Sequence, residues 1–511
     1  MALWVAALLG LLCWRGGGGY ALAAGTFFVD GANPGCSDTA PGAGTEPTPY
    51  CTISAAAKAR GGPGTTLLVK PAFYRERVLV PASGAEGSPF VFQALGAPVV
   101  VDGADDFSSP AQWTPFSGDV WLAASVSWGP KQVFIDGSRL TPSTGAPAAL
   151  PPGTFRHVLG EGLYVNLGGD NPGSHEALVG RRDYGFDLVG QYWVTIEGFT
   201  VTRTGGNGIY LRCNQTPPPH NLTVTQNIVT FTGNHGISVQ SCTNVLISST
   251  VVSDSRGTGI RLDAVEDSTI QDNEALRNAV GINPYKTRNN LLQRNNVHHN
   301  EGTGIKISGD SRFLSDNNLS LQNRSWYNGG HGFSHFEVAG TLHIGDVAYG
   351  NLNEGFSVDW NATGTKIFNS IAVNNGLTAG GFDLFVRSTS APGFVSNYNI
   401  FWNSTSQAPM KYAGTQYPTL AAFTAATGQD ANSTQADPRF VDPANGDFRL
   451  QAGSPAIDAA DSSVPSWPAT DAAGRARADD PATVNSGAGP VPYADRGALE
   501  FLPPPVAALT V

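Results

Sequence analysis

Residues 259–285 read GIRLDAVEDSTIQDNEALRNAVGINPY, and in this stretch the pair Gly259-Ile260 returns as Gly281-Ile282. The same glycine–apolar mark recurs through the middle of the chain, at Gly208, Gly236, Gly259, Gly281, Gly304, Gly332, Gly355 and Gly381. Subtraction gives spacings of 28, 23, 22, 23, 28, 23 and 26 residues. A period near 23, with short strands, asparagine-rich turns and no helical pattern, predicts stacked strands in a parallel β-helix. Equivalent residues of successive coils then lie in columns about 4.8 Å apart.

Composition agrees with a β-solenoid and excludes one class of partner. The 511 residues are 41% apolar and 14% charged, and 62 of them are glycine. The apolar fraction is sufficient for a long hydrophobic core, and the sequence contains few helix-forming runs. The net charge of −11 argues against nucleic acid, which binds clustered lysine and arginine. No phosphate-cradling glycine loop precedes a helix, so no organic cofactor is expected.

The N-terminus and the cysteines predict export. Residues 1–23 combine a short apolar run with a small-x-small site at Ala21-Leu22-Ala23, which is typical of a signal peptide. No other segment is long and apolar enough to span a bilayer. Removing the signal peptide leaves Cys36, Cys51, Cys213 and Cys242, an even number that predicts disulfides. Of three pairings, register favours Cys36–Cys51 with Cys213–Cys242.

The chain divides into four further regions. We expect an N-terminal cap and first coils over residues 24–110, with a short cap helix at 53–59. Residues 111–190 break the period and predict a small β insertion. Residues 191–404 form the regular coils, and residues 405–511 form a connector and a loop-rich C-terminal cap. The fold class is thus all-β.

The period of two along each strand separates inward from outward residues. The residue after each marker glycine should point inward, and the next outward. The outward set gathers Arg261, Asp263, Tyr285 and Lys306 on three consecutive coils, with Lys286 and Arg288 just beyond. Aromatic rings beside mixed charges suit a polysaccharide, because rings stack on sugar faces and charges meet hydroxyls and carboxylates. The alternative is a salt-bridged exposed sheet without a ligand.

Several segments resemble secreted right-handed β-helix proteins of the pectate-lyase-like class. LLVKPAFYRE at residues 67–76 resembles their opening coil, and DPRFV at 437–441, GDFRL at 446–450 and SPAID at 454–458 resemble their ending. The resemblance covers most of the mature chain. It implies the fold more strongly than an activity, since this fold hosts lyases, hydrolases, epimerases and adhesive stalks.

One shorter resemblance concerns chemistry. GTGIKISG at residues 302–309 is similar to a coil of the family 9 pectate lyases, whose matching lysine removes the proton α to a uronate carboxylate. It implies Lys306 as a catalytic base. That family also binds calcium through clustered aspartates, but the matching residues 279–283 read AVGIN and leave Asp263 alone. Either Arg261, Lys286 and Arg288 replace the metal, or the activity has changed or been lost.

Two other functions stay open. A glycoside hydrolase needs two carboxylates at a defined separation, and Asp359 with Asp383 is the candidate pair, near Glu337 and Glu354. His331 and His335 are alternative acid–base groups. A non-catalytic carbohydrate-binding or cell-surface stalk is the third interpretation. The favoured hypothesis is a secreted, monomeric lyase acting on an acidic polysaccharide.

Overall fold

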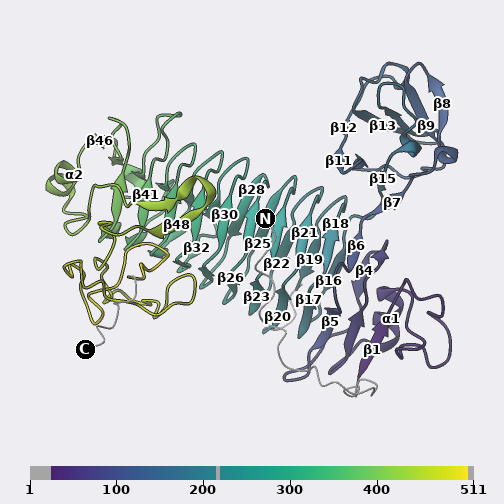
Figure 1. Ribbon diagram of the computed structural model, residues 1–511, viewed down its shortest axis with the longest axis horizontal. Coiled ribbons are helices and arrows are strands. Elements are labelled where there is room, and N and C mark those ends of the chain that lie inside the picture. The colour runs from purple at the N-terminus through teal and green to yellow at the C-terminus, as the bar shows by residue number, and fades with distance from the viewer. Residues whose placement is uncertain (1–24, 214–218, 504–511) are drawn as a thin grey trace, which may run out of the picture.

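The computed structural model, described for residues 25–213 and 219–503, is an elongated stack of coils with two appended regions (Figure 1). Each complete coil contributes one strand to each of three parallel sheets, here called A, B and C. The parallel β-helix predicted from the glycine–apolar marks is therefore confirmed. The inward side chains, including the isoleucines that follow the marker glycines, form one continuous core inside the coil.

Sheet A has twelve strands. They are β1 (Thr26–Val29), β2 (Thr66–Val69), β5 (Phe90–Ala94), β17 (Val194–Glu197), β20 (Leu222–Thr225), β23 (Val245–Ser248), β26 (Thr269–Gln271), β29 (Leu291–Gln293), β33 (Leu319–Leu321), β37 (Leu342–Ile344), β40 (Lys366–Phe368) and β43 (Val395–Asn397).

Sheet B has eleven strands. They are β3 (Phe73–Tyr74), β6 (Val100–Asp102), β18 (Thr200–Thr202), β21 (Ile228–Thr230), β24 (Val251–Ser253), β27 (Glu274–Leu276), β30 (Asn296–His298), β34 (Arg324–Trp326), β38 (Val347–Tyr349), β41 (Ile371–Val373) and β44 (Ile400–Trp402).

Sheet C has twelve strands, the last pair antiparallel. They are β4 (Val78–Val80), β16 (Phe186–Val189), β19 (Ile209–Arg212), β22 (Ile237–Gln240), β25 (Thr258–Asp263), β28 (Val280–Tyr285), β31 (Ile305–Ser308), β35 (Phe333–Phe336), β39 (Phe356–Asp359), β42 (Leu384–Val386), β45 (Met410–Tyr412) and β46 (Thr415–Tyr417).

Buried asparagines close the corner between sheets B and C. The backbone N–H of Asn278 donates to the side-chain oxygen of Asn300 at 3.0 Å, and Asn300 repeats the contact with Asn328 at 3.1 Å. Asn351 and Asn375 continue this ladder. A buried corner leaves backbone groups without strand partners, and these amides satisfy them. The asparagine-rich turns of the sequence are thus structural elements of the core.

Helix α1 (Ile53–Arg60) covers the N-terminal end of the coil, where a cap helix was expected. Thr52 begins it by accepting the N–H of Ala55 on its hydroxyl, at 3.2 Å. Ile53, Ala56 and Ala57 are buried against the first strands, so the helix protects the open core from solvent.

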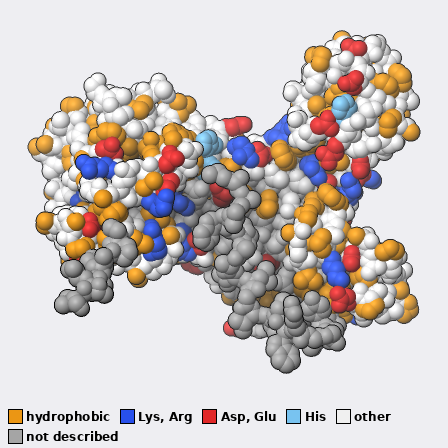
Figure 2. Space-filling view, in the orientation of Figure 1, with side chains coloured by type: hydrophobic (Ala, Val, Ile, Leu, Met, Phe, Trp, Pro, Cys, Tyr) orange, Lys and Arg blue, Asp and Glu red, His pale blue; other side chains and the backbone are white. Residues whose placement is uncertain are grey.

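The insertion leaves the coil after β6 and returns before β16. Its strands are β7 (Ala104–Asp106), β8 (Thr114–Ser117), β9 (Val120–Ala123), β10 (Val133–Ile135), β11 (Ser138–Arg139), β12 (Thr141–Pro142), β13 (Thr154–Val158), β14 (Gly162–Asn166) and β15 (Ala177–Gly180). It forms a separate lobe, with charged side chains gathered where it joins the coil (Figure 2). Strand β16, inside the expected range 111–190, already pairs with β4 and β19 of sheet C.

The C-terminal segment folds back on the coil. Helix α2 (Leu420–Thr427) is followed by the hairpin of β47 (Phe440–Asp442) and β48 (Asp447–Leu450). Phe448 packs on Trp326 and Tyr349, with ring centroids 5.9 and 5.8 Å apart, so the hairpin covers the outer face of sheet B. A small parallel pair, β32 (Ser315–Asp316) with β36 (Val338–Ala339), and short 3-10 helices at Pro110–Gln112, Pro147–Ala149, Pro172–Ser174, Ser388–Ser390 and Pro443–Asn445 complete the described elements.

Both predicted disulfides are present. Cys36 pairs with Cys51, and Cys213 pairs with Cys242 on the adjacent coil, each with Cα atoms 5.0 Å apart. Disulfides are typical of proteins from oxidising, extracellular compartments. The expected signal peptide lies outside the described residues. Over residues 25–213 and 219–503, no helix has the length and hydrophobicity needed to cross a membrane.

Candidate functional site on sheet C

The outward face of sheet C brings the predicted cluster together. Strand register places Arg261 opposite Asn283, and Asp263 opposite Tyr285 on the next coil. Tyr285 in turn lies opposite Ser308, two residues after Lys306. The parallel stacking of β25, β28 and β31 is therefore what turns residues spaced 22 or 23 apart in sequence into one surface.

Arg261 is the centre of this surface. Its guanidinium lies 4.4 Å from the ring centroid of Tyr285 and 3.7 Å from the carboxylate of Asp263. It also donates a hydrogen bond to the side-chain oxygen of Asn283. Burial lowers the pKa of Arg261, which nonetheless stays a cation at neutral pH because its normal value is so high.

Asn283 belongs to this candidate surface, and sequence reasoning did not select it. Its side-chain amide donates to the carbonyl of Lys306 and to the hydroxyl of Ser308, the latter at 3.1 Å. With the bond from Arg261, the Asn283 side chain links three consecutive coils and orders this surface. Its signal in the sequence was its place two residues after Gly281, in the outward column between Arg261 and Lys306.

Lys286 lies beside the same aromatic ring. Its ammonium is 4.9 Å from the centroid of Tyr285, 5.4 Å from that of Phe313 and 2.7 Å from the carboxylate of Asp310. The hydrogen bond from Lys286 lowers the pKa of Asp310 to about 2, so this pair is charged across the physiological range.

Arg288 is separated from the cluster. It lies at the turn toward sheet A, is exposed, and faces Glu266 at 4.0 Å and Asp316 at 3.3 Å. Glu266 lies on the preceding coil, and Asp316 ends β32 on the next coil. Arg288 therefore extends a ladder of surface ion pairs, and the structure does not bring it to the face that holds Tyr285.

Lys306 differs from the arginines of sheet C. Arg212 lies 3.5 Å from Asp187, and Arg387, just after β42, pairs with Asp359. By contrast, the Lys306 ammonium makes no hydrogen bond or ion pair with any residue that the structure describes. The side chain is half-buried, on the strand between Asn283 and Ser334. Lys411 of the same sheet also lacks an acid partner, but its ammonium lies over the rings of Phe382 and Phe385. The nitrogen of Lys306 is therefore available for a ligand.

A hollow of about 400 Å³ opens beside Arg261, on the N-terminal side of the cluster. It is lined by Asn207, Tyr210, Asn234, His235, Ser238, Gln240, Arg261 and Asp263. Burial and the nearby Arg261 lower the pKa of His235 to about 4, so its imidazole is neutral at neutral pH. Its Nδ1 accepts the backbone N–H of Thr258 at 3.0 Å, which identifies the protonated nitrogen as Nε2.

The structure corrects the candidate hydrolase pair. Asp359 is outward but tied to Arg387 by two contacts. Asp383 was expected to point outward, and this is wrong: its side chain is fully buried, and its Oδ1 accepts from the backbone and amide of Asn375. Burial raises the pKa of Asp383 well above its usual range. Leu384, not Phe382, pairs with Phe356, so the register of this coil differs by two residues.

The two candidate histidines lie in different environments. His331 is half-buried at the edge of sheet C, with Nδ1 2.7 Å from the carboxylate of Glu354. His335 is fully buried in the core, where its Nε2 contacts Nε2 of His343 at 2.7 Å. His343 bonds Asp346 at 2.8 Å. His335 is therefore a core group, and His331 alone borders the candidate face.

The described residues contain no group of three or more His, Cys, Asp or Glu side chains arranged to hold a metal ion. Where the resemblance called for aspartates, Asn283 and Tyr285 stand beside the cationic Arg261. A guanidinium at that position repels a divalent cation. The residues present do not fit a calcium site.

Comparison with known proteins identifies the fold. A family model for a right-handed β-helix region matches residues 184–334. The solved complex of XylC with xylose superposes with a TM-score of 0.56 at 14% identity, over 75% of this chain and 76% of that one. Pectate lyase Pel9A gives a TM-score of 0.50 at 16% identity, over 93% and 96%. The fold of this chain is a right-handed parallel β-helix, similar to the fold of pectate lyase Pel9A.

Curated relatives of this β-helix match over shorter ranges. Pectate lyase L of Dickeya dadantii is 25% identical over 303 residues, 55% of this chain and 64% of that protein. The uncharacterized protein YwoF of Bacillus subtilis is 27% identical over 207 residues, 39% and 40%. The chain thus spans between 40% and 64% of the length of these relatives. A carbohydrate-active β-helix fits this set of neighbours.

Proposed function

We propose that this protein is a secreted, monomeric polysaccharide lyase that cleaves uronate-containing chains by β-elimination on the face of sheet C. One observation carries the proposal: Lys306 is a half-buried lysine without a partner among the described residues, whereas Arg212, Arg261 and Arg387 are each paired with an acid and Lys411 lies over the rings of Phe382 and Phe385. A general base must have its nitrogen free for the substrate.

The reaction assigns Lys306 one role. In its neutral form, the Lys306 amine takes the proton from C5 of a uronate, next to the carboxylate. The electron pair left on C5 forms a C4–C5 double bond, the bond from C4 to the glycosidic oxygen breaks, and that oxygen takes a proton from water. Negative charge builds on the carboxylate as C5 is deprotonated, so a fixed cation near it lowers the barrier.

Arg261 is the cation we assign to the carboxylate. Its contact with Asp263 is 3.7 Å long, well beyond the 2.7–2.9 Å of a charge-assisted hydrogen bond, so its fork is not saturated by that acid. The ring of Tyr285 and the side-chain oxygen of Asn283 contact the guanidinium and hold it in place. The adjoining hollow of about 400 Å³ falls in the size range of sugar-sized ligand sites. The mechanism uses no calcium at any step.

Similarity supports the same class of reaction. Pectate lyase L and Pel9A are lyases by name, and the TM-score of 0.50 with Pel9A extends over nearly the whole chain. The hydrolase alternative loses its candidate pair, because Asp383 is buried and hydrogen-bonded to Asn375.

The test follows unsaturated uronate ends by ultraviolet absorbance on polygalacturonate, alginate and glycosaminoglycans. Lys306→Ala should lower turnover by about 10²- to 10⁴-fold, the usual contribution of a general base. Lys411→Ala is the matched control: Lys411 is also an outward lysine of sheet C, but it lies over the rings of Phe382 and Phe385 at 5.5 and 5.7 Å. It should retain activity.

Three outcomes would contradict the proposal. Equal activity of wild type and Lys306→Ala would remove the assigned base. New reducing ends without unsaturation would indicate a glycoside hydrolase. Binding without any product would indicate a carbohydrate-binding or surface module.

A further inference from the structure

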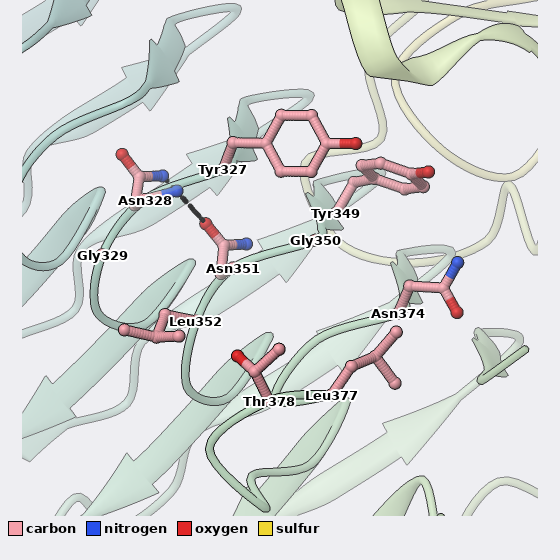
Figure 3. Close-up of a pocket in the computed structure, with 10 residues that line it drawn as sticks. All are labelled: Tyr327, Asn328, Gly329, Tyr349, Gly350, Asn351, Leu352, Asn374, Leu377 and Thr378. Carbon is pink, nitrogen blue, oxygen red and sulfur yellow. Dashed lines mark hydrogen bonds between the residues drawn. The ribbon is translucent and has the colours of Figure 1, made fainter. Parts of the chain in front are cut away.

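A second hollow, of about 470 Å³, lies at the corner between sheets B and C in the C-terminal half of the coil (Figure 3). Tyr327 and Tyr349 line one side, and Leu352, Leu377 and Thr378 lie opposite them. It lies on the turns that precede β35, β39 and β42, outside the Arg261–Lys306 face. We propose that this hollow binds a neutral sugar unit, with the ring of Tyr327 as its stacking platform.

Tyr327 is held as a platform by the absence of a side chain at Gly350. A Cβ atom at Gly350 would lie 2.5 Å from Cε1 and 2.8 Å from Cδ1 of the Tyr327 ring. The ring therefore rests against the backbone of the next coil. His299 and Tyr349 flank it, with ring centroids 5.7 and 5.6 Å away. A ring supported on one side and open on the other presents a flat apolar face at little entropic cost on binding.

The lining determines the chemistry of the ligand. The ten residues around the hollow are tyrosine, asparagine, glycine, leucine and threonine, with no charged side chain. Leu352 and Leu377 are 45% and 37% exposed, which is high for leucine and leaves an apolar wall in contact with water. Rings and leucines contact the C–H faces of a pyranose, and a charged ligand would find no counter-charge here.

Polar side chains that can bond the hydroxyl groups of a sugar lie at the end of the same hollow. Asn374 accepts the backbone N–H of Ser404 at 2.8 Å, and this bond fixes the position of its amide. The tyrosine hydroxyls and the exposed Thr378 side chain complete the polar set. Asn328 and Asn351 also line the hollow, but their amides are engaged in the corner ladder. The arrangement of a supported ring, apolar walls and few directional polar groups is typical of a sugar site.

The hollow continues toward the C-terminal cap. A neighbouring cavity of about 330 Å³ shares Tyr349 and Asn374 with it and reaches Trp402 and the hairpin residue Phe440. The charged Asp437 and Arg439 also line this second cavity, so the proposal of a neutral sugar concerns the first hollow alone.

The experiment measures binding of neutral oligosaccharides (xylo-, cello- and galacto-oligosaccharides) to the whole protein by calorimetry and by ligand-observed NMR. Tyr327→Ala should weaken binding about tenfold, the loss of one stacking contact. Tyr327→Phe keeps the ring and should keep most of the affinity. Tyr192→Ala, at a tyrosine that is 40% exposed elsewhere on the coil, should change nothing.

The result is independent of the proposed lyase activity, because Lys306→Ala should leave this binding unchanged. Absence of binding by every neutral oligosaccharide at millimolar concentration would overturn the inference. So would equal affinity of wild type and Tyr327→Ala, or a preference for uronate oligomers or peptides over neutral sugars. Matching circular dichroism spectra and melting temperatures would show that the variants are folded.

Discussion

The coil and the C-terminal cap bury their polar groups in opposite ways. The corner between sheets B and C holds neutral asparagines, whose amides bond the backbone of the neighbouring coil, as Asn300 does to Ala275 and Asn278. The cap buries carboxylates instead: Asp495 and Glu500 are each 1% exposed. A repeated backbone offers the same unpaired groups in successive coils, so a ladder of neutral amides satisfies them from Asn278 to Asn351, and Asp383 ends the ladder at Asn375. The cap has no repeat and uses charged groups for single contacts.

This difference extends to protonation. In the coil, burial lowers the pKa of His235 to about 4 and that of His335 to about 3, so both are neutral in the folded protein. In the cap, burial and neighbouring acids raise the pKa of Asp458 to about 6, and burial with Glu500 raises that of Asp495. Through His235 and His335 the coil should lose stability in acid, and through Asp458 and Asp495 the cap should loosen in base. Asp383, whose pKa is also raised by burial, adds base sensitivity at one coil.

The largest expected effect concerns the corner ladder. Asn300→Ala removes an amide that accepts from Asn278 and donates to Ala275, leaving buried backbone groups unpaired. Each costs about 1–3 kcal/mol, so the free energy of unfolding should fall by about 4 kcal/mol in total. Asn432→Ala, an exposed position beside the cap, should cost under about 0.5 kcal/mol. Equal melting temperatures for the two variants would break the comparison.

Acid should act mainly on the coil. As pH falls below about 6.5, the unfolded chain protonates His235 while the folded chain does not, so the free energy of unfolding falls. The slope is about 1.4 kcal/mol per pH unit for each such group, down to the folded pKa of about 4. His235→Asn keeps an acceptor for Thr258 and should flatten the slope of melting temperature against pH. An unchanged slope would assign the acid sensitivity elsewhere.

Raising the pH should lower the stability of the cap, by less than lowering the pH lowers the stability of the coil. The unfolded chain releases the Asp495 proton near pH 4, whereas the folded cap holds it to a higher pH, so its stability falls as pH rises through that window. Arg477, which lies 2.7 Å from Glu500, offsets part of the loss. Hydrogen exchange should show cap amides opening faster at about pH 8 than at about pH 5, relative to amides of β23 to β31. Slower opening in the cap would contradict the sign.

Calcium removal should have no effect. Because residues 279–283 supply no carboxylate and the cationic Arg261 contacts Asn283, a chelator should change neither the melting temperature nor the rate on any substrate. Added calcium serves as the converse measurement. A rate that depends on calcium would contradict this prediction, because it would require calcium ligands on the face of sheet C.

Much of the face of sheet C could be predicted, because period and alternation are local properties. Arg261, Asp263, Tyr285 and Lys306 were placed together by counting from marker glycines, and register bears this out. The prediction that Asp383 points outward was wrong for a physical reason. The residues between Asn375 and Asp383 form a loop that shifts the next strand by two positions, so Asp383 ends the asparagine ladder. Counting from Gly381 could not detect that shift.

The sequence alone determined the coil and most of its inward and outward columns, since these depend on spacing within a repeat, and it favoured the disulfide pairing that the structure has. Tertiary structure decided which cations are neutralised and which are free. Lys286 and Arg288 form ion pairs with acids on neighbouring coils, and Lys306 forms none with any described residue. The ring of Tyr327 rests against Gly350 of the next coil. Such contacts depend on side-chain direction across coils and on the space left by a neighbour, which spacing in one chain does not specify.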